Sequence, residues 1–375
     1  MKKIGILTYS YGTNYGGTLQ CIGLYKVLKE IGFEVKIINY MSENMYCKRN
    51  KYISGSGIRK NILKTFKFEN LKKFWIKLRY VDSIIKKFDD FREKNLKITK
   101  GSDNLKELIK GNDINTIIVG SDQVWSGEKI YFLNEVNENK IKKISYAACS
   151  GKDFFKEEDR EYLVTSLKKF YKISVRNEHT RSFVERLIGD SPDVVCDPSI
   201  LYDYKEFLND KIKKEKYILT YILGEDIKEG NDKAIKKIKE IFGNIKVIAI
   251  GIPFANSGNL RFYPWADEVL YDASPEEWLN LINNAEFVYT DSYHGALFSM
   301  KFHKPFLAYY TEINRAPRFI DLAKRYNVDK YIVNTLEEAI EKKSISKKIN
   351  YEKIDLELEV HRKYSMEFLK KALED

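Results

Sequence analysis

The residues best suited to chemistry lie in a short polar turn between two apolar runs. The first run ends at Thr290 and Asp291, the turn reads Ser292-Tyr293-His294-Gly295, and the second run starts at Ala296. This pattern predicts a strand, a tight turn and a helix, which places an imidazole and free backbone N–H groups where a phosphate or carboxylate can bind. A single histidine is more often structural, but this setting favours a functional role for His294.

Asp122 is a second candidate catalytic residue, in the segment Gly120-Ser121-Asp122-Gln123-Val124-Trp125 that follows another predicted strand. Its carboxylate can accept a proton from a hydroxyl group or can cap a helix, and the sequence supports both interpretations equally. Trp125 can stack on a sugar ring, although a single aromatic residue in such a place is more often part of the core. We keep Trp125 as a candidate sugar contact.

Three arginines are candidates for binding an anion. Arg176 lies where a predicted strand ends and a helix starts, so its guanidinium can hold a carboxylate or phosphate through two hydrogen bonds. A surface salt bridge is the alternative. Arg315 and Arg318 lie near a helix start, one helix and one strand after His294, and either one could instead be a solvated charge.

A loop rich in glycine and tyrosine follows the first predicted strand and opens the first long helix, which is where doubly wound sheets bind ligands. It has neither the GxGxxG pattern nor a Walker lysine, so it indicates neither a dinucleotide site nor a P-loop. A plain glycine-rich connector is the simpler interpretation, but tyrosine and asparagine side chains suit sugar hydroxyls. The residues that we predict to face a sugar are Thr13, Asn14, Tyr15, Gly16 and Gly17.

These segments belong to a chain in which strand-like runs alternate with helical patterns, as in parallel sheets covered by helices. The strand candidates are residues 4–8, 35–38, 116–119, 144–148, 173–175, 194–196, 217–223, 246–250, 287–290 and 306–309. We therefore predict an α/β fold with two sheets joined near residue 170. The predicted domains are residues 1–170 and 171–350, and a final helix in residues 351–375 could pack back on the first domain.

The composition is that of a globular protein, with 375 residues, 43% hydrophobic and 32% charged. No run of eighteen apolar residues and no signal peptide is present, so we expect a cytoplasmic protein. The four cysteines lack ligand spacing, which argues against a zinc site and a disulfide framework. Because no nucleic-acid-binding motif is present, the net charge of +11 favours anionic substrates or a membrane surface over nucleic acid.

Residues 48–97 interrupt the alternation, with many lysines between aromatic and aliphatic residues. We predict one or two amphipathic helices inserted into the first domain. A helix with a solvated basic face is the simpler interpretation, and peripheral contact with the inner face of an anionic membrane is the alternative. His303 and His361 lie in no comparable polar turn, and we expect both at the surface.

In their order along the chain, these segments resemble the polysaccharide pyruvyl transferase family. The matching segments are residues 6–8, 11–17, 120–125, 174–176, 197–198, 291–295 and 304–306, which together span nearly the whole chain. The resemblance implies two Rossmann-like domains facing across a cleft, as in GT-B glycosyltransferases. The first domain would bind the acceptor and the second the donor.

The resemblance also implies phosphoenolpyruvate as donor and a sugar of a cell-surface glycan as acceptor. That glycan would be an exopolysaccharide, capsule or cell-wall polymer, or its lipid-linked oligosaccharide precursor, and the products would be a pyruvate ketal and phosphate. In the family, the donor site includes an arginine matched by Arg176 and a histidine matched by His294. Some members carry an arginine where this chain has Ser292, so one cation is missing, and Arg315 or Arg318 could replace it.

On this basis the predicted donor-binding residues are Arg176, Ser292, His294, Gly295, Arg315 and Arg318. His294 would give a proton to the enol carbon of the donor or orient its phosphate, and no metal or cofactor is required. Two alternatives remain open at this point. One is a GT-B glycosyltransferase that uses a nucleotide sugar, and the other is a glycan-binding protein of the same fold without activity.

Overall fold

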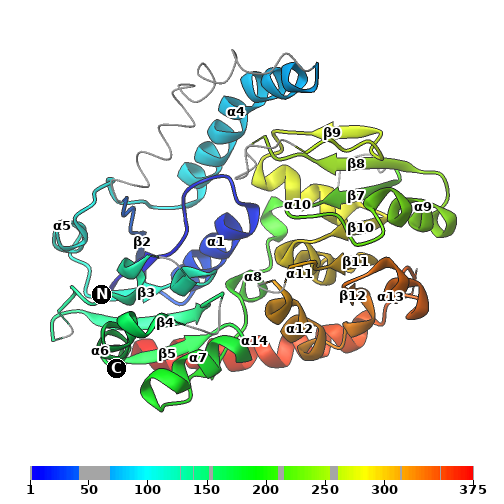
Figure 1. Cartoon of the computed structure of the whole chain (residues 1–375). Helices are drawn as coiled ribbons and strands as arrows, with labels where there is room; N and C mark the ends of the chain where they lie inside the picture. The colour runs from blue at the N-terminus through cyan, green and yellow to red at the C-terminus, as the bar shows by residue number, and fades with distance from the viewer. Residues whose placement is uncertain are drawn as a thin grey trace.

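Two parallel β-sheets with apolar clusters packed on them form the two halves of the molecule in the computed structural model (Figure 1). The structure describes residues 2–41, 68–126, 128–137, 139–151, 155–209, 215–253, 261–312, 315–346 and 348–374. The prediction of an α/β fold with two Rossmann-like domains is confirmed.

The first sheet has the strand order β2-β1-β3-β4-β5-β6, and every pairing in it is parallel. Its strands are β1 (Lys3–Leu7), β2 (Glu34–Ile37), β3 (Thr116–Val119), β4 (Lys142–Ala148), β5 (Lys172–Val175) and β6 (Asp193–Val194). The helices of this half are α1 (Tyr15–Glu30), α5 (Leu105–Gly111), α6 (Arg160–Leu167), α7 (Glu178–Ile188) and the short α8 (Pro198–Leu201). The strand order reverses between β1 and β3, which is where open parallel sheets bind ligands.

The second sheet has the order β12-β11-β10-β7-β8-β9 and is also parallel. Its strands are β7 (Tyr217–Tyr221), β8 (Lys246–Ile250), β9 (Glu268–Leu270), β10 (Phe287–Thr290), β11 (Phe306–Tyr309) and β12 (Ile332–Val333). Its helices are α9 (Asn231–Phe242), α10 (Pro275–Asn284), α11 (Tyr293–Lys301), α12 (Ala316–Arg325) and α13 (Leu336–Glu341). The reversal in this sheet lies between β7 and β10, so the polar turn after β10 occupies the corresponding place.

The boundary between the two halves differs from the prediction. Both β5 and β6 pair within the first sheet, so that half continues beyond residue 170, and the chain crosses to the second sheet only after α8. A short apolar run such as residues 173–175 has the sequence character of a strand. It contains no information about which of two parallel sheets it joins, because that choice depends on distant partners.

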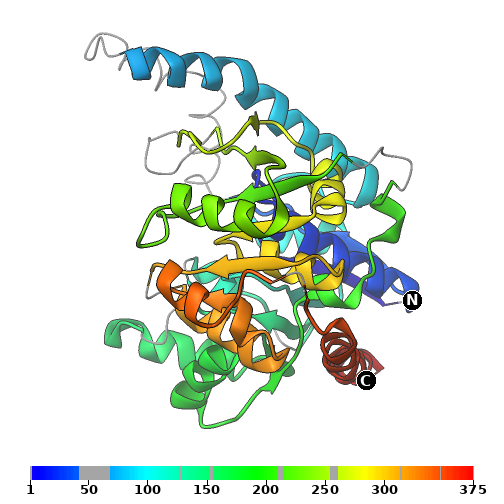
Figure 2. The same cartoon turned by 90° about the vertical axis from the view of Figure 1, so that its right-hand side faces the viewer.

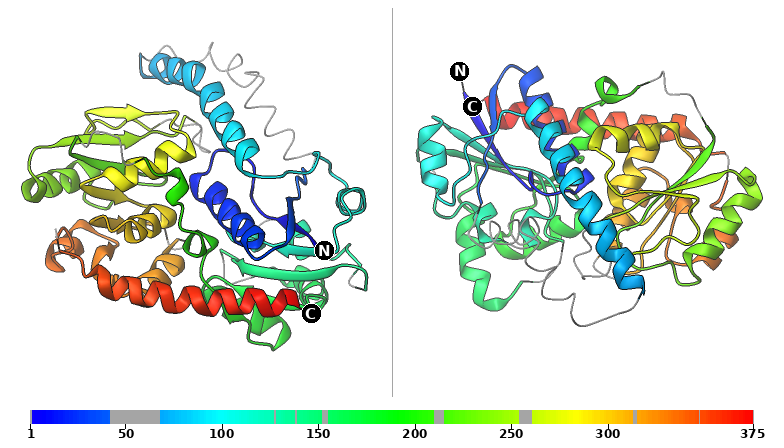
Figure 3. Two further views of the ribbon diagram at one scale, coloured as in Figure 1. Left: turned by 180° about the vertical axis from the view of Figure 1, so that it is seen from behind. Right: turned by 90° about the horizontal axis from the view of Figure 1, so that it is seen from above.

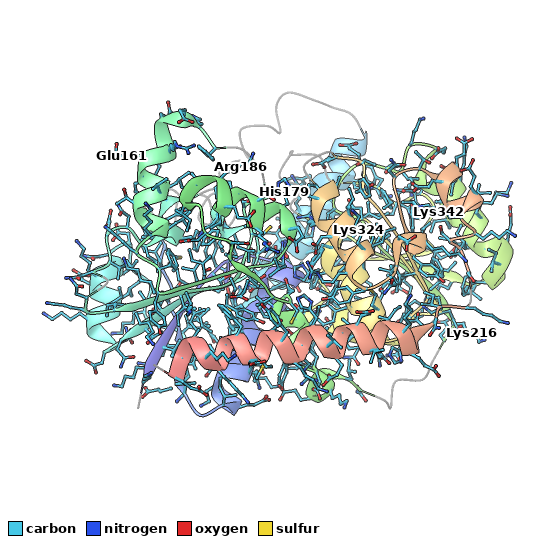
Figure 4. The ribbon with its side chains drawn as sticks, turned by 90° about the horizontal axis from the view of Figure 1, so that it is seen from below. Glu161, His179, Arg186, Lys216, Lys324 and Lys342 are labelled. Atoms are coloured by element: carbon cyan, nitrogen blue, oxygen red, sulfur yellow. The ribbon has the colours of Figure 1, made fainter. Side chains whose placement is uncertain are left out.

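The final helix, α14 (Tyr351–Glu374), extends along both halves of the molecule (Figure 3) and is seen nearly end-on in Figure 2. At its start, the Tyr351 ring stacks on His303 with ring centroids 4.8 Å apart. Farther along, Ser365 Oγ accepts a hydrogen bond of 2.8 Å from the N–H of Cys196 in the first half. Figure 4 looks onto this side and shows α14 in front, with labelled His179 at the start of α7, a helix that contacts α12.

A second long helix, α4 (Phe68–Asn95), connects the halves on the side opposite α14 (Figure 1). In the first half, its Arg92 donates a 2.6 Å hydrogen bond to the carbonyl of Gly12. In the second half, Ser83 Oγ donates to Asp272 Oδ2 at 2.6 Å, and Tyr80 packs against Tyr271. One helix on each side therefore connects the two halves, in addition to the direct packing of α1 on α10 and α11.

Helix α4 corresponds to part of the predicted insertion at residues 48–97. Residues 48–67 lie outside the described residues, and residues 68–95 form one continuous helix. Among the described residues, no helix has both the length and the apolar character that a membrane-spanning segment requires.

His361 is buried, and the expectation that it lies at the surface is wrong. Its Nδ1 is 2.8 Å from Tyr326 Oη of the second half, and its Nε2 is 3.3 Å from the carbonyl of Val194 of the first. Burial and the positive charge of Arg325 lower the pKa of His361 to about 4. The imidazole is therefore neutral at physiological pH and links the two halves through α14. His303, in contrast, is half-exposed, as expected.

This burial predicts a specific loss of stability in acid. The unfolded chain takes up a proton at His361 near pH 6.5, whereas the folded chain does so only near pH 4, so the free energy of unfolding falls as the pH drops between these values. The expected loss is about 3 kcal/mol. Denaturant unfolding at a series of pH values should show a smaller loss for His361→Gln than for the wild type. His303→Gln serves as the control, and an unchanged pH dependence in His361→Gln would contradict this assignment.

Candidate functional site

A buried carboxylate, Asp197, connects the strand ends of the first half with the polar turn of the second. It follows β6 and caps α8, where its Oδ1 accepts the N–H of Ser199 at 2.9 Å. Its Oδ2 accepts hydrogen bonds from Ser121 Oγ at 3.1 Å and from Arg176 Nη1 at 3.0 Å. The same oxygen lies 3.6 Å from His294 Nε2. One carboxylate thus faces groups that follow β3, β5 and β10.

The electrostatic surroundings keep Asp197 ionised. Burial alone would raise the pKa of this carboxyl, but His294, Arg176 and the N–H of Ser199 together hold it well below its usual range. A buried charge is tolerated when it is paired and hydrogen-bonded in this way. Asp197 therefore supplies a permanent negative charge beside the imidazole.

His294 lies in the first turn of α11, next to its N-cap residue Ser292, whose Oγ accepts the N–H of Gly295 at 3.2 Å. Its Nε2 is enclosed and faces Asp197, but the 3.6 Å separation is longer than a hydrogen bond. Its Nδ1 faces α1 of the first half, so closely that a Cβ on Gly16 would lie 2.0 Å from it. The two halves thus lie on either side of the imidazole, and position 16 must be glycine.

Ser292 and Gly295 both serve the turn that positions His294. Ser292 caps α11, and a Cβ on Gly295 would lie 2.7 Å from Oγ1 of Thr290. The hydroxyl of Thr290 in turn accepts the N–H of Ser292 at 3.0 Å. These contacts hold the polar turn in one conformation.

Arg176 is fixed on three sides. Its N–H donates to the carbonyl of Ala148 at 3.1 Å, its guanidinium pairs with Asp197, and the guanidinium carbon lies 4.8 Å from the ring centroid of Tyr293. Its buried Nε has no hydrogen-bond partner in the described part of the chain. Such an N–H group inside the protein is available to an anion.

Arg318, at the start of α12, brings positive charge without a compensating partner. Burial, together with the neighbouring Arg176 and Arg315, lowers the pKa of its guanidinium. Across the described ranges, no ion pair forms at Arg318, and its Nε has no hydrogen-bond partner. The three guanidinium groups lie close enough to repel one another. An anion bound among them would relieve this repulsion.

Arg315 is occupied differently from Arg318. Its Nη1 pairs with Asp291 Oδ2 at 2.6 Å, and Asp291 also accepts the N–H groups of Leu223 and Gly224 at 2.6 Å each. This arrangement ties the end of β10 to the end of β7. Arg315 therefore holds these strand ends together, and its predicted contact with the donor stays a prediction.

Asp122 adopts a left-handed backbone conformation, with φ at +75°. Its carbonyl accepts the N–H of Cys149 at 3.1 Å, and its Oδ1 accepts the N–H of Gln123 at 2.9 Å. Its Oδ2 faces the start of α1, 3.4 Å from where a Cβ on Gly17 would lie. A non-glycine residue with positive φ costs about 1 kcal/mol and is frequent at functional sites. The carboxylate of Asp122 is half-buried, and its negative charge acts on both Arg176 and Arg318, where it opposes the lowering of the Arg318 pKa by burial and by the neighbouring arginines.

Asn14 and Thr13 lie in the loop that precedes α1. Asn14 is exposed and caps this helix, because its Oδ1 accepts the N–H of Gly17 at 2.9 Å. Thr13 is half-buried in the same loop. Thr13, Asn14, Gly16 and Gly17 thus gather at the start of α1, beside His294 and Asp122.

The prediction that the aromatic residues Tyr15 and Trp125 contact a sugar is wrong. Tyr15 is 2% exposed, donates its hydroxyl to the carbonyl of Ala273 at 2.7 Å and stacks on Trp278. Trp125 is 5% exposed, donates its Nε1 to the carbonyl of Tyr131 and stacks on Phe132. Both rings bury large apolar surfaces in the cores that position the site, so neither can stack on a ligand.

The sequence around Asp197 predicts a strand end followed by a turn, with a structural role for this residue, and nothing in the sequence indicates that the Tyr293 ring lies under Arg176. The sequence does indicate the capping role of Asp197. An Asp-Pro pair after a strand-like run is typical of a helix N-cap followed by proline in the first turn, as observed at α8. The pairing of Asp197 with Arg176, however, depends on the three-dimensional arrangement of β5 and β6.

Comparison with known proteins supports the family expected from the sequence. The model of the family described as polysaccharide pyruvyl transferase matches residues 14–312. No curated protein matches the chain.

Among solved structures, the chain is similar to the UDP-GlcNAc 2-epimerase of Methanocaldococcus jannaschii in complex with UDP-GlcNAc and UDP. The identity is 14%, the TM-score is 0.51, and 94% of each chain is covered. It is also similar to the UDP-N-acetylglucosamine 2-epimerase of Rickettsia bellii, with 12% identity, a TM-score of 0.52 and coverage of 100% of this chain and 96% of the other. At these identities the similarity establishes the GT-B-like fold alone.

The charge pairing at Asp197 predicts a large effect on stability. Asp197→Asn removes the negative charge and leaves Arg176 buried without its partner, so we expect the free energy of unfolding to fall by roughly 3–5 kcal/mol. Asp203→Asn is the matched control, because Asp203 forms a surface pair with Lys205 at 3.6 Å and should change stability little. Urea unfolding of the two variants compares them directly, and equal stabilities would contradict the buried charge pairing.

Proposed function

The chain belongs to the polysaccharide pyruvyl transferase family, and we propose that it transfers the pyruvyl group of phosphoenolpyruvate to a sugar of a cell-surface glycan. A pyruvate ketal would form and phosphate would leave. The observation that carries this proposal is the Arg318 guanidinium, which forms no ion pair among the described residues and lies beside Arg176 and an imidazole that faces an ionised carboxylate.

The negative charge of the donor would pair with the arginine that has no ion pair in this site. Phosphoenolpyruvate carries a carboxylate and a phosphate, and both groups bind best to fixed guanidinium groups. We assign Arg318 as the principal donor ligand because it forms no ion pair in the described ranges, and the free Nε of Arg176 as a second ligand. Arg318 would then supply the positive charge that some family members place where this chain has Ser292.

Pyruvyl transfer begins with protonation of the donor. The methylene carbon of phosphoenolpyruvate must gain a proton before its neighbouring carbon becomes cationic enough for a hydroxyl to attack. A protonated His294 can give this proton from Nδ1, while Asp197 stabilises the charge at Nε2. The first hydroxyl then adds, phosphate leaves with the C–O bonding electrons, and the second hydroxyl closes the ketal.

The acceptor hydroxyls must lose their protons during this sequence. The carboxylate of Asp122 lies beside the start of α1, and its charge acts on both Arg176 and Arg318. We therefore propose that Asp122 accepts the proton of one acceptor hydroxyl. The second proton can leave with the phosphate. The exposed amide of Asn14 and the hydroxyl of Thr13 are placed at the same helix start to orient the sugar.

The direct test is release of phosphate from phosphoenolpyruvate in the presence of cell-envelope oligosaccharides. Arg318→Gln should raise the KM for phosphoenolpyruvate about 10- to 100-fold, since a charged hydrogen bond contributes about 1.5–3 kcal/mol. Arg362→Gln is the control, because Arg362 is on the exposed side of α14. No phosphate release with any acceptor, or an unchanged KM in Arg318→Gln, would contradict the proposal.

A thermal-shift experiment separates this proposal from nucleotide-sugar chemistry. Phosphoenolpyruvate should raise the Tm of the wild type and should raise it less for Arg318→Gln. Stabilisation by UDP-sugars, with none by phosphoenolpyruvate, would favour a glycosyltransferase instead.

The contact between α1 and His294 gives a further prediction. Gly16→Ala would place a methyl group 2.0 Å from the Nδ1 position of His294, so the imidazole must move, and we expect kcat to fall at least about 100-fold. Gly111→Ala is the matched control, because a Cβ at Gly111 meets no atom within 4 Å. Steady-state kinetics and circular dichroism of both variants test this, and full activity in Gly16→Ala would exclude the observed position of His294 from catalysis.

A further inference from the structure

The first half of α4 presents an apolar surface that no other described residue covers. One side of this segment packs on the second half of the molecule, where Ile76 and Tyr80 join the cluster around Tyr271. On its outer side, Trp75 is 63% exposed and Leu78 is 55% exposed. A tryptophan and a leucine three positions apart lie on one face of a helix, so their exposed surfaces adjoin.

Basic residues border this surface. Lys72 and Arg79 are exposed and lie three and four positions from Trp75, while Lys77 is half-exposed. Residues 71–81 contain no acidic residue, and the exposed Asp82, three positions after Arg79, is the first carboxylate beyond them. The described part of α4 therefore places two apolar side chains among three cations.

The sequence shows how unevenly the positive charge is distributed. Residues 48–81 contain eleven lysines and arginines and one glutamate, a net charge of +10, against +11 for the whole chain of 375 residues. The rest of the chain is nearly neutral. The net charge is thus a property of this one region, and lysines spread evenly by composition would not produce such a concentration.

We propose that the surface formed by Lys72, Trp75, Leu78 and Arg79 docks on an anionic lipid bilayer. Tryptophan and leucine enter the boundary between head groups and acyl chains, while lysine and arginine bind the anionic head groups. A nucleic acid would satisfy the cations and could stack a base on Trp75, but it would leave the aliphatic side chain of Leu78 in water. The bilayer accommodates both kinds of side chain on one face.

The place of α4 fixes how the molecule would lie on the membrane. This helix crosses both halves on the side opposite α14, as the view from above in Figure 3 shows. The bilayer would therefore cover the α4 side, and the exposed face of α14 would point away from it. This inference does not depend on the proposed reaction, because binding to vesicles is measured without substrate.

The test is co-flotation of the full chain with vesicles of phosphatidylcholine, with and without phosphatidylglycerol. The wild type should bind the anionic vesicles and lose binding as salt is added. Trp75→Ser with Leu78→Ser should lower the partition coefficient at least about tenfold. Lys72→Glu with Arg79→Glu should lower it at least about 20-fold.

A matched control lies on the other side of the molecule. Leu356 and Val360 of α14 are 64% and 58% exposed, so Leu356→Ser with Val360→Ser removes two apolar side chains of similar fractional exposure and should leave flotation unchanged. Failure of the wild type to float with anionic vesicles would overturn the proposal. It would also be overturned if the Trp75 and Leu78 variant floated like the wild type, or if a duplex RNA bound the chain more tightly than the vesicles and with no dependence on Trp75.

Discussion

The pairing of the buried Asp197 carboxylate with Arg176 is the interaction on which the candidate site depends. The same carboxylate accepts from Ser121 and faces His294, so it orders groups that follow three different strands. Removing any one partner leaves a charge or a polar group buried without compensation, at a cost of several kcal/mol. Folding itself therefore fixes these groups, and a small anion meets positive charge that needs no reorganisation.

This pairing requires the two halves of the molecule to keep their relative positions. Helices α4 and α14 connect the halves on opposite sides, through Arg92 and Ser83 on one and through His361 on the other. A third link is Lys301 at the end of α11, which donates to the carbonyl of Ser199 at 2.8 Å and so holds α8 directly beyond Asp197. Burial lowers the pKa of Lys301 to about 7, as expected for an ammonium enclosed at such a junction.

Local patterns in the sequence were sufficient to predict the alternation of strands and helices and the placement of His294 at a helix start. A strand end followed by a cap and an apolar helix lies within about ten residues, so neighbouring residues define it. The orientation of Tyr15 could not be predicted in the same way, because its hydroxyl partner Ala273 is 258 residues away. The same reason explains the misplaced domain boundary. It also explains why the pairing of Asp197 could not be predicted, since its hydrogen bond to Ser121 spans 76 residues. The predicted roles of Arg318 and Asp122 in binding and catalysis await the experiments.

The position of His294 between Gly16 and Asp197 means that neither half of the molecule contains a complete site. The imidazole belongs to the second half, whereas the helix start and the carboxylate that flank it belong to the first. The halves pack directly on each other here, because α1 contacts both α10 and α11. Exchanging one half for that of a relative would therefore disturb the site even if every residue named above were retained.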